Sequence, residues 1–158
     1  MRLLDVNVLL ALAWPNHLHH RRAHAWFRAI QHDGWATCPI TETGFVRVSS
    51  NSRAIADAGP PSLAIAVLRR LRALPGHVFW TDDVSPVAGS RDTPFDRVVG
   101  YRQVTDAHLL ALAIRHGGRL ATFDRGVTDL VPAGYRGAAE LIPNLPLPGR
   151  GTAGRHPA

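Results

Sequence analysis

The stretch Arg119-Leu120-Ala121-Thr122-Phe123-Asp124 (residues 119–124) is a short apolar run that ends at a carboxylate, and Arg2-Leu3-Leu4-Asp5 (residues 2–5) has the same form near the start of the chain. Runs of this length are typical of strands buried in a parallel sheet. In an open α/β sheet, ligands bind in the crevice at the carboxyl ends of the strands. The two runs therefore predict that Asp5 and Asp124 lie at one edge of one sheet.

A third acid is predicted to face the same interior from a helix. The segment 104–113 has helical spacing, and its apolar stripe of Leu109, Leu110 and Ala113 begins with Asp106 on the same face. A helix buries its apolar stripe against the sheet. We therefore expect Asp106 to point inward.

Strands and helices alternate along the chain, which predicts an α/β fold with a parallel sheet covered on both faces. The predicted strands cover residues 2–5, 35–38, 77–80 and 120–123. The predicted helices cover residues 7–13, 17–31, 41–50, 63–74 (capped by Ser62) and 105–116 (ended by Gly117-Gly118).

Length and composition predict one domain over residues 1–143, followed by a disordered tail over residues 144–158. The 158 residues can bury a core without disulfides, whereas the tail is rich in Pro and Gly and almost free of apolar side chains. Cys38 is the only cysteine, which fits a reducing cytoplasm. Asp5 and Asn7 interrupt the apolar run 3–14, so it is interpreted as core rather than a signal peptide, and no other run is long enough for a bilayer.

The net charge of +6 and the isoelectric point of about 11.1 suit a nucleic-acid partner, because clustered cations attract phosphate. All 18 basic residues are arginine, a bias that coding composition alone could produce, so charge favours nucleic acid only slightly. The combination with inward-facing acids is more informative. A cleft lined by carboxylates repels phosphate and needs a divalent metal to accept it.

Four acids are candidates for such a site, namely Asp5, Glu42, Asp106 and Asp124, each at a strand end or a helix start. Taken singly, each has an ordinary explanation as a helix cap, a first-turn acid or a turn residue. Taken together they would crowd one edge of the sheet, where like charges cost stability unless a cation is present. Carboxylate oxygens without cysteine suit Mg²⁺ or Mn²⁺.

The motifs carried by these acids, in this order, resemble the PIN-domain toxins of the VapC family. They are Leu4-Asp5-Val6-Asn7-Val8-Leu9-Leu10-Ala11, Thr41-Glu42, Thr105-Asp106-Ala107-His108-Leu109-Leu110-Ala111-Leu112-Ala113 and Leu120-Ala121-Thr122-Phe123-Asp124-Arg125-Gly126. The resemblance covers the chain to about Pro143. It implies a three-layer α/β/α sandwich with a short parallel sheet and a Mg²⁺-dependent endoribonuclease, with Mn²⁺ as a substitute.

The resemblance also implies roles for individual residues. Asp5, Glu42, Asp106 and Asp124 would be the acidic quartet, with Asp5 and Asp106 as the usual metal ligands. Asp124 and Glu42 would complete the metal shell or orient a water. Asn7 and Thr105 match polar positions that support the site. Arg125, next to Asp124, is the best candidate for binding RNA, and an ion pair with the acids is the alternative.

Two kinds of protein partner follow from the resemblance. A cognate antitoxin would wrap the toxin with its C-terminal segment, and an apolar groove lined by residues such as Leu10, Trp14 and Trp26 could receive it. A homodimer or a toxin–antitoxin hetero-oligomer is also implied. The RNA substrate would be a single-stranded loop of a structured RNA such as tRNA or rRNA, where unstacked bases can be read.

Three alternatives stay open. A phosphatase of the haloacid dehalogenase type also begins with an Asp after its first strand, but Asn7 stands where its second Asp is usual and the chain has no Lys. A non-catalytic RNA- or partner-binding module would keep the acids as structural caps. His20 and His24, one helical turn apart, could share a transition metal, but no acid or cysteine nearby in sequence completes the set, so a solvated face is expected.

Overall fold

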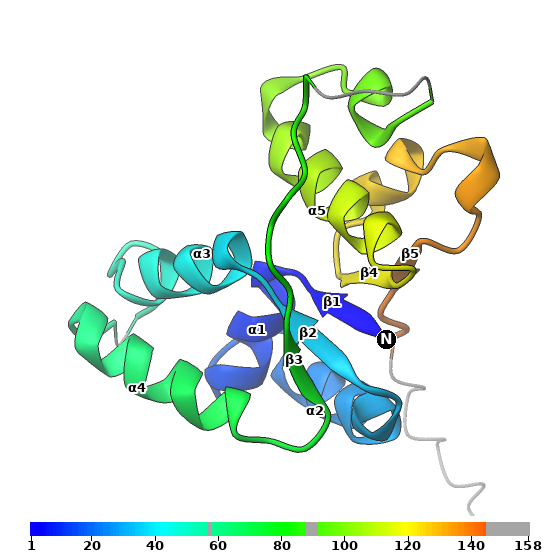
Figure 1. Ribbon diagram of the computed structural model, residues 1–158. Helices are drawn as coiled ribbons and strands as arrows, with labels where there is room; N and C mark the ends of the chain where they lie inside the picture. Colours follow the sequence, from blue (N-terminus) through cyan, green and yellow to red (C-terminus); the bar gives the residue numbers. More distant parts are fainter. Residues whose placement is uncertain (57, 88–91, 145–158) are drawn as a thin grey trace, which may run out of the picture.

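The computed structural model describes residues 1–56, 58–87 and 92–144 and has a five-stranded parallel sheet (Figure 1). The strand order is β3-β2-β1-β4-β5, so β1 and β4 are central neighbours. The strands are β1 (Arg2–Leu4), β2 (Trp35–Thr37), β3 (His77–Phe79), β4 (Arg119–Thr122) and β5 (Ala139–Leu141). The predicted parallel sheet is confirmed, and four of its strands coincide with the predicted runs.

The fifth strand was not predicted. Ala139-Glu140-Leu141 has no β-branched or aromatic residue, which are the residue types that mark a strand. It is a strand because it pairs in parallel with β4, where Leu120 is opposite Ala139 and Thr122 is opposite Leu141. Tertiary pairing therefore decides this element, and local propensity does not.

Helices cover both faces of the sheet, which confirms the three-layer α/β/α architecture. On one face lie α1 (Val6–Ala13), α2 (His20–Ile30), α3 (Pro39–Ser49) and α4 (Pro61–Arg72); α5 (Val104–Arg115) lies on the other (Figure 1). The two faces bury separate apolar clusters, one around Leu9, Trp26 and Phe45 and the other around Trp80 and Leu110. The connection after β3 crosses from the first face to the α5 face (Figure 1).

Three helix starts lie two or three residues from their predicted positions: α2 begins at His20 rather than at residue 17, and proline explains the other two. Helix α3 begins at Pro39 rather than at residue 41, and α4 begins at Pro61 with Pro60 as its N-cap rather than Ser62. Proline is favoured in the first helical turn, because its φ is already helical and its missing N–H has no partner there anyway. Glu42 remains in the first turn of α3 despite the shift.

Other predictions about side chains also need correction. Leu10 and Trp26 are 8% exposed and belong to the core, so they do not line an open groove. His20 and His24 are half-buried rather than solvated, and their ring nitrogens hydrogen-bond to the carbonyl oxygens of Ala11 and Leu12 at 2.8 and 2.9 Å. These bonds tie α2 to the end of α1.

The predicted tail, residues 144–158, lies outside the described residues except for Asn144. Its disorder and the domain boundary at residue 143 therefore stay predictions. Within the described ranges, no helix has the length and apolar character needed to cross a membrane.

Candidate active site

The central pair of strands brings the two acids of the first prediction together. In the β1–β4 register, Leu4 is opposite Ala121, and the amide of Asp5 donates to the carbonyl of Ala121 at 3.1 Å. The next residues on the two strands, Asp5 and Thr122, are both buried at the carboxyl edge of the sheet. This edge is where the strand order predicts a ligand site.

A closed hydrogen-bond network fixes the Asp5 carboxylate. The Thr122 hydroxyl donates to Asp5 Oδ2 at 2.6 Å, and the Asn7 side-chain amide donates to the same oxygen at 2.7 Å and to Thr122 Oγ1 at 2.9 Å. Asn7 Oδ1 accepts from the amide of Phe123 at 3.3 Å. Asn7 thus uses both amide hydrogens and its oxygen, which determines its orientation. Both bonds to Asp5 reach Oδ2, so neither side chain holds Oδ1.

Asp124 lies beside this network at the start of the turn after β4. Its amide donates to Thr122 Oγ1 at 3.0 Å, and its carboxylate Oδ1 accepts from the amide of Gly126 at 2.8 Å. Asp124 Oδ1 therefore acts as a turn residue's acceptor, which is the ordinary explanation that the sequence offered for this acid. The side chain is nonetheless close enough to Asp5 and Asp106 to raise the pKa of both.

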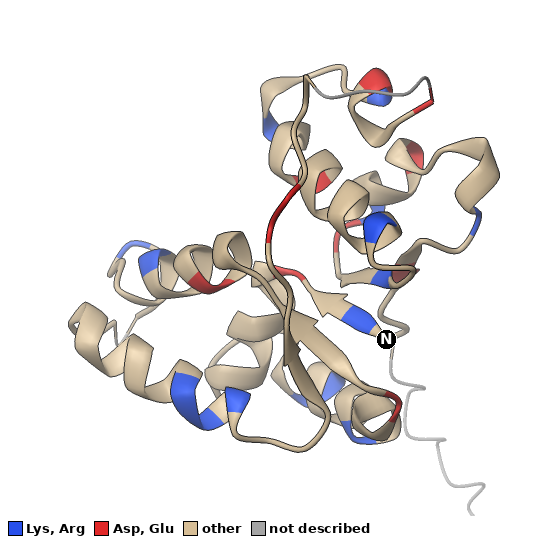
Figure 2. Cartoon of the chain, in the orientation of Figure 1, with Lys and Arg blue, Asp and Glu red and all other residues tan. Residues whose placement is uncertain are grey.

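Asp106 approaches from the opposite layer, in the first turn of α5. It is half-buried, and burial together with the charges of Asp5 and Asp124 raises its pKa to about 6. Burial and Asp124 also raise the pKa of Asp5, while the Thr122 hydroxyl opposes the shift. Figure 2 shows acidic residues in red where β1 ends and at one place on α5. The structure therefore assembles Asp5, Asp106 and Asp124, and no described Lys, Arg or His forms an ion pair with them.

Glu42, the fourth predicted acid, is engaged on the β2–β3 side of the same edge. Its Oε1 accepts from the Thr37 hydroxyl at 2.6 Å, and its Oε2 forms an ion pair with Arg72 of α4 at 3.3 Å. The ring Nε2 of His77 lies 2.8 Å from the Thr37 hydroxyl. Glu42 is not among the charges that shift the pKa of Asp5 or Asp106.

Of the two predicted supporting residues, one hydrogen-bonds to an acid of the site and the other does not. Asn7 is part of the network, whereas Thr105 is exposed and its hydroxyl makes no hydrogen bond within the described residues. Arg125 is exposed and forms no ion pair with the acids in the same ranges.

Two polar groups at this edge were missed by the sequence analysis. Thr122 is the centre of the network, and its signal was a polar residue between the apolar residues of a buried strand. Asp82, after β3, binds His108 of α5 through both carboxylate oxygens at 2.9 and 2.8 Å. Nothing in the local sequence pairs these two residues.

The donor set fits a hard divalent cation. Three uncompensated carboxylates with oxygen-bearing neighbours are what Mg²⁺ or Mn²⁺ prefers, and burial of like charges is costly without a cation. Within residues 1–56, 58–87 and 92–144, no three His, Cys, Asp or Glu side chains are close enough to enclose an ion by themselves. Mg²⁺ usually takes only one or two carboxylates and completes its octahedron with water and phosphate, so a pair of these acids suffices.

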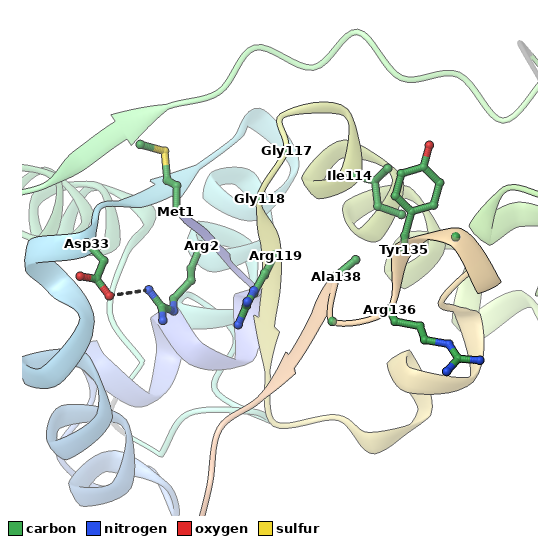
Figure 3. A pocket seen from close by; sticks show the side chains of 12 residues that line it. Met1, Arg2, Asp33, Ile114, Gly117, Gly118, Arg119, Tyr135, Arg136 and Ala138 are labelled. Atoms are coloured by element: carbon green, nitrogen blue, oxygen red, sulfur yellow. Dashed lines mark hydrogen bonds and ion pairs between the residues drawn. The ribbon is translucent and has the colours of Figure 1, made fainter.

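A separate cavity at the amino ends of the strands has a different character (Figure 3). It is lined by residues that include Arg2, Asp33 and Arg119, and Arg2 forms ion pairs with Asp33 at 3.2 Å and with Glu140 at 2.9 Å. Its charges are thus largely paired within the protein. Asp5, Asp106 and Asp124, which form no ion pair within the described residues, lie at the opposite, carboxyl edge of the sheet.

A short parallel sheet between helical layers, with carboxylates at its carboxyl edge, defines a PIN-type α/β/α domain. The family model described as PIN domain matches residues 2–131, and the chain belongs to this family. Ribonuclease VapC38 of Mycobacterium tuberculosis (strain ATCC 25618 / H37Rv) is 54% identical over 142 residues, which cover 90% of this chain and 98% of the relative.

Two further relatives from the same strain agree. Ribonuclease VapC39 is 52% identical over 132 residues, covering 84% of this chain and 94% of the relative. Ribonuclease VapC44 is 46% identical over 127 residues, covering 79% and 87%. Within the PIN-domain family, the chain therefore belongs with the VapC proteins, and the predicted resemblance is confirmed.

Proposed function

We propose that this protein is a metal-dependent endoribonuclease, the toxin of a toxin–antitoxin pair. One observation carries the proposal: three carboxylates from three elements meet at one sheet edge, and no cation of the described residues forms an ion pair with them. Their repulsion helps to raise the pKa of Asp106 to about 6. The names of the relatives, which are ribonucleases, support the choice of RNA as substrate.

The residues divide the work as follows. Asp5 and Asp106 would hold Mg²⁺, or Mn²⁺ in its place, and Asp124 would complete the shell or orient the attacking water. When bound, the ion supplies electrostatic stabilisation of the scissile phosphate and acidifies a water. Thr122 and Asn7 hold Asp5 in one orientation, so that little reorganisation is needed when substrate arrives. Glu42 is proposed as the fourth acid of the site.

The substrate proposed is a single-stranded loop of a structured RNA such as tRNA or rRNA, because an unstacked strand can present one phosphate to a metal at a sheet edge. Arg125 would contact that strand. A cognate antitoxin would restrain the activity, for example with an arginine placed among the acids in place of the metal. We place this activity in the cytoplasm, in a homodimer or a toxin–antitoxin hetero-oligomer.

The decisive experiment is cleavage of total cellular RNA by the purified chain with Mg²⁺ or Mn²⁺, with chelator, and with Asp106→Asn as control. Discrete fragments that require the metal and vanish in the variant would establish a selective endoribonuclease. A folded, antitoxin-free sample that cleaves nothing, and whose thermal stability does not respond to Mg²⁺, would favour a non-catalytic binding module. Turnover of a generic phosphomonoester without RNA cleavage would favour the phosphatase.

A further inference from the structure

Two arginines from distant parts of the chain meet beside the acidic site. Arg22, on α2, places its guanidinium 4.8 Å from the ring centroid of Phe123, and Arg125 follows Phe123 by two residues. On the same ring, His19 stacks with a centroid separation of 4.5 Å. Phe123 itself stands between Thr122 and Asp124 of the acidic site. The arginine pair is therefore at the β4 end of the site, on its α2 side.

Arg22 is held in place by the backbone. Its Nε donates to the carbonyl oxygen of Pro143 at 2.7 Å, and its Nη2 donates to the carbonyl oxygen of Ile142. These carbonyls follow β5, so Arg22 joins α2 to the end of the edge strand. Two donors on neutral acceptors leave the charge of the guanidinium uncompensated, and the remaining donors are pre-positioned at little cost in side-chain entropy.

Among the described residues, the two guanidinium groups have no anionic partner. Burial and the charge of Arg125 both lower the pKa of Arg22. In the described part of the chain, neither arginine lies within ion-pair distance of a carboxylate, although Asp129 is four residues after Arg125. Asp124, the nearest acid in sequence, turns its Oδ1 to the amide of Gly126. Adjacent cations without a counterion are stabilised when an anion binds between them.

We propose that Arg22 and Arg125 together bind a backbone phosphate of the RNA, next to the phosphate that is cleaved at the acids. The inference rests on the proposed function and adds to it a phosphate subsite shared by two elements. Arginine suits this role because its planar donors match phosphate oxygens. A stacked base is not the ligand here, since His19 and Arg22 already cover the ring of Phe123.

The test measures RNA binding as a function of salt, because each neutralised phosphate of a single strand contributes about 0.7 to the slope of log affinity against log salt. A labelled single-stranded oligoribonucleotide is titrated with the Asp106→Asn variant in chelator, so that cleavage does not interfere. Adding Arg125→Gln should weaken binding about threefold to tenfold and make the slope less steep by about 0.7 to 1. Arg22→Gln should do the same.

The matched control is Arg21→Gln, the exposed neighbour of Arg22 on α2, which should leave the slope unchanged. If the two arginines share one phosphate, the losses from Arg22→Gln and Arg125→Gln should not add in the double variant, whereas independent contacts would add. Thermal melting checks the fold. Should Arg22→Gln fail to fold, Arg125→Gln carries the test alone, because Arg125 is exposed.

A separate cleavage assay distinguishes the two possible failures. Wild-type protein that cleaves RNA with Mg²⁺, while Arg125→Gln keeps the slope of Arg21→Gln, would overturn the phosphate subsite and leave the ribonuclease function standing. Wild-type protein that neither binds nor cleaves RNA would overturn the ribonuclease function, and the subsite with it.

Discussion

The acids at the two halves of one sheet edge differ in whether a cation of the protein balances their charge. At the ends of β1 and β4, Asp5 and Asp124 face Asp106, and no described cation pairs with them. At the end of β2, Glu42 is held by Arg72 and by the Thr37 hydroxyl. Both halves carry the same sequence signal, an acid after a strand. Only in the first half do neighbouring carboxylates repel one another, and a bound cation would relieve that repulsion.

The contrast teaches that the partners of an acid, rather than its position, indicate its role. A carboxylate with an arginine 3.3 Å away already has its counterion. A half-buried carboxylate whose neighbours are other carboxylates, as at Asp106, lowers the free energy of unfolding until a cation binds. If this difference in charge balance is also a difference in function, variants in the two halves of the edge should lose cleavage activity to different extents.

The largest effect is expected from Asp5→Asn or Asp106→Asn. Each change removes a proposed metal ligand while keeping the shape of the side chain and one acceptor oxygen, so cleavage should fall on the order of a thousandfold or more. Circular dichroism and thermal melting should show an intact fold. Full activity in either purified variant would refute the assignment of Asp5, Asp106 and Asp124, the acidic trio, as the catalytic centre.

A smaller loss is expected from Thr122→Val, which is nearly isosteric. It removes the donor to Asp5 Oδ2 and the acceptor for Asn7 and for the Asp124 amide. Cleavage should fall about tenfold to a hundredfold, and the free energy of unfolding should fall by about 1–3 kcal/mol, because buried polar groups lose partners. Since the Thr122 hydroxyl lowers the pKa of Asp5, the acid limb of the pH–rate profile should move to higher pH.

Thr43→Val is the matched control, since within the described residues the exposed Thr43 hydroxyl hydrogen-bonds only to carbonyl oxygens of its own helix. Activity and the pH profile should be unchanged in this variant. If Thr122→Val leaves the pH profile in place while lowering stability, the hydroxyl is a structural partner of Asp5 and does not tune it.

The sequence predicted the sheet edge and its trio of acids because both depend on local patterns: apolar runs that end in Asp, and a helical stripe that includes Asp106. It could not predict the partner of Glu42, because Arg72 is thirty residues away and reaches it only when α4 packs beside α3. The same holds for Thr122 at the end of β4 and Asn7 in the first turn of α1, which are 115 residues apart in sequence and hydrogen-bonded in the fold. Strand β5 was missed because its pairing with β4, rather than its composition, makes it a strand.

Glu42→Gln tests most directly whether an acid that already has a counterion matters less for cleavage than the unpaired acids. If charge balance separates the two halves of the edge, this variant should lose no more than about tenfold in cleavage, since its carboxylate is already neutralised by Arg72. Loss of the partly exposed ion pair should cost less than about 1 kcal/mol of stability. The matched variant Arg72→Gln should show a similar cost in stability. A drop in cleavage as large as that of Asp106→Asn would place Glu42 functionally with the trio.

The smallest effect is in the pH dependence of stability without metal. The pKa of Asp106 is raised to about 6 in the folded protein from an ordinary value of 3.8, so the folded state binds more protons than the unfolded state between these values. Unfolding free energy should therefore fall as pH rises from about 4 to 6, by about 1 kcal/mol after allowance for solvent screening of this half-buried group. Urea titrations across this range measure it.

Asp106→Asn should flatten this fall in stability, and saturating Mg²⁺ should oppose it in the wild type by mass action but much less in the variant. Asp83→Asn is the control. The Arg115 guanidinium lowers the pKa of Asp83, so Asp83 does not contribute to the fall in stability between pH 4 and 6. If Glu42→Gln flattens the slope as much as Asp106→Asn does, the acids of the two halves are coupled. If only the trio responds, repulsion in the folded protein is confined to the half of the edge that is proposed to bind metal.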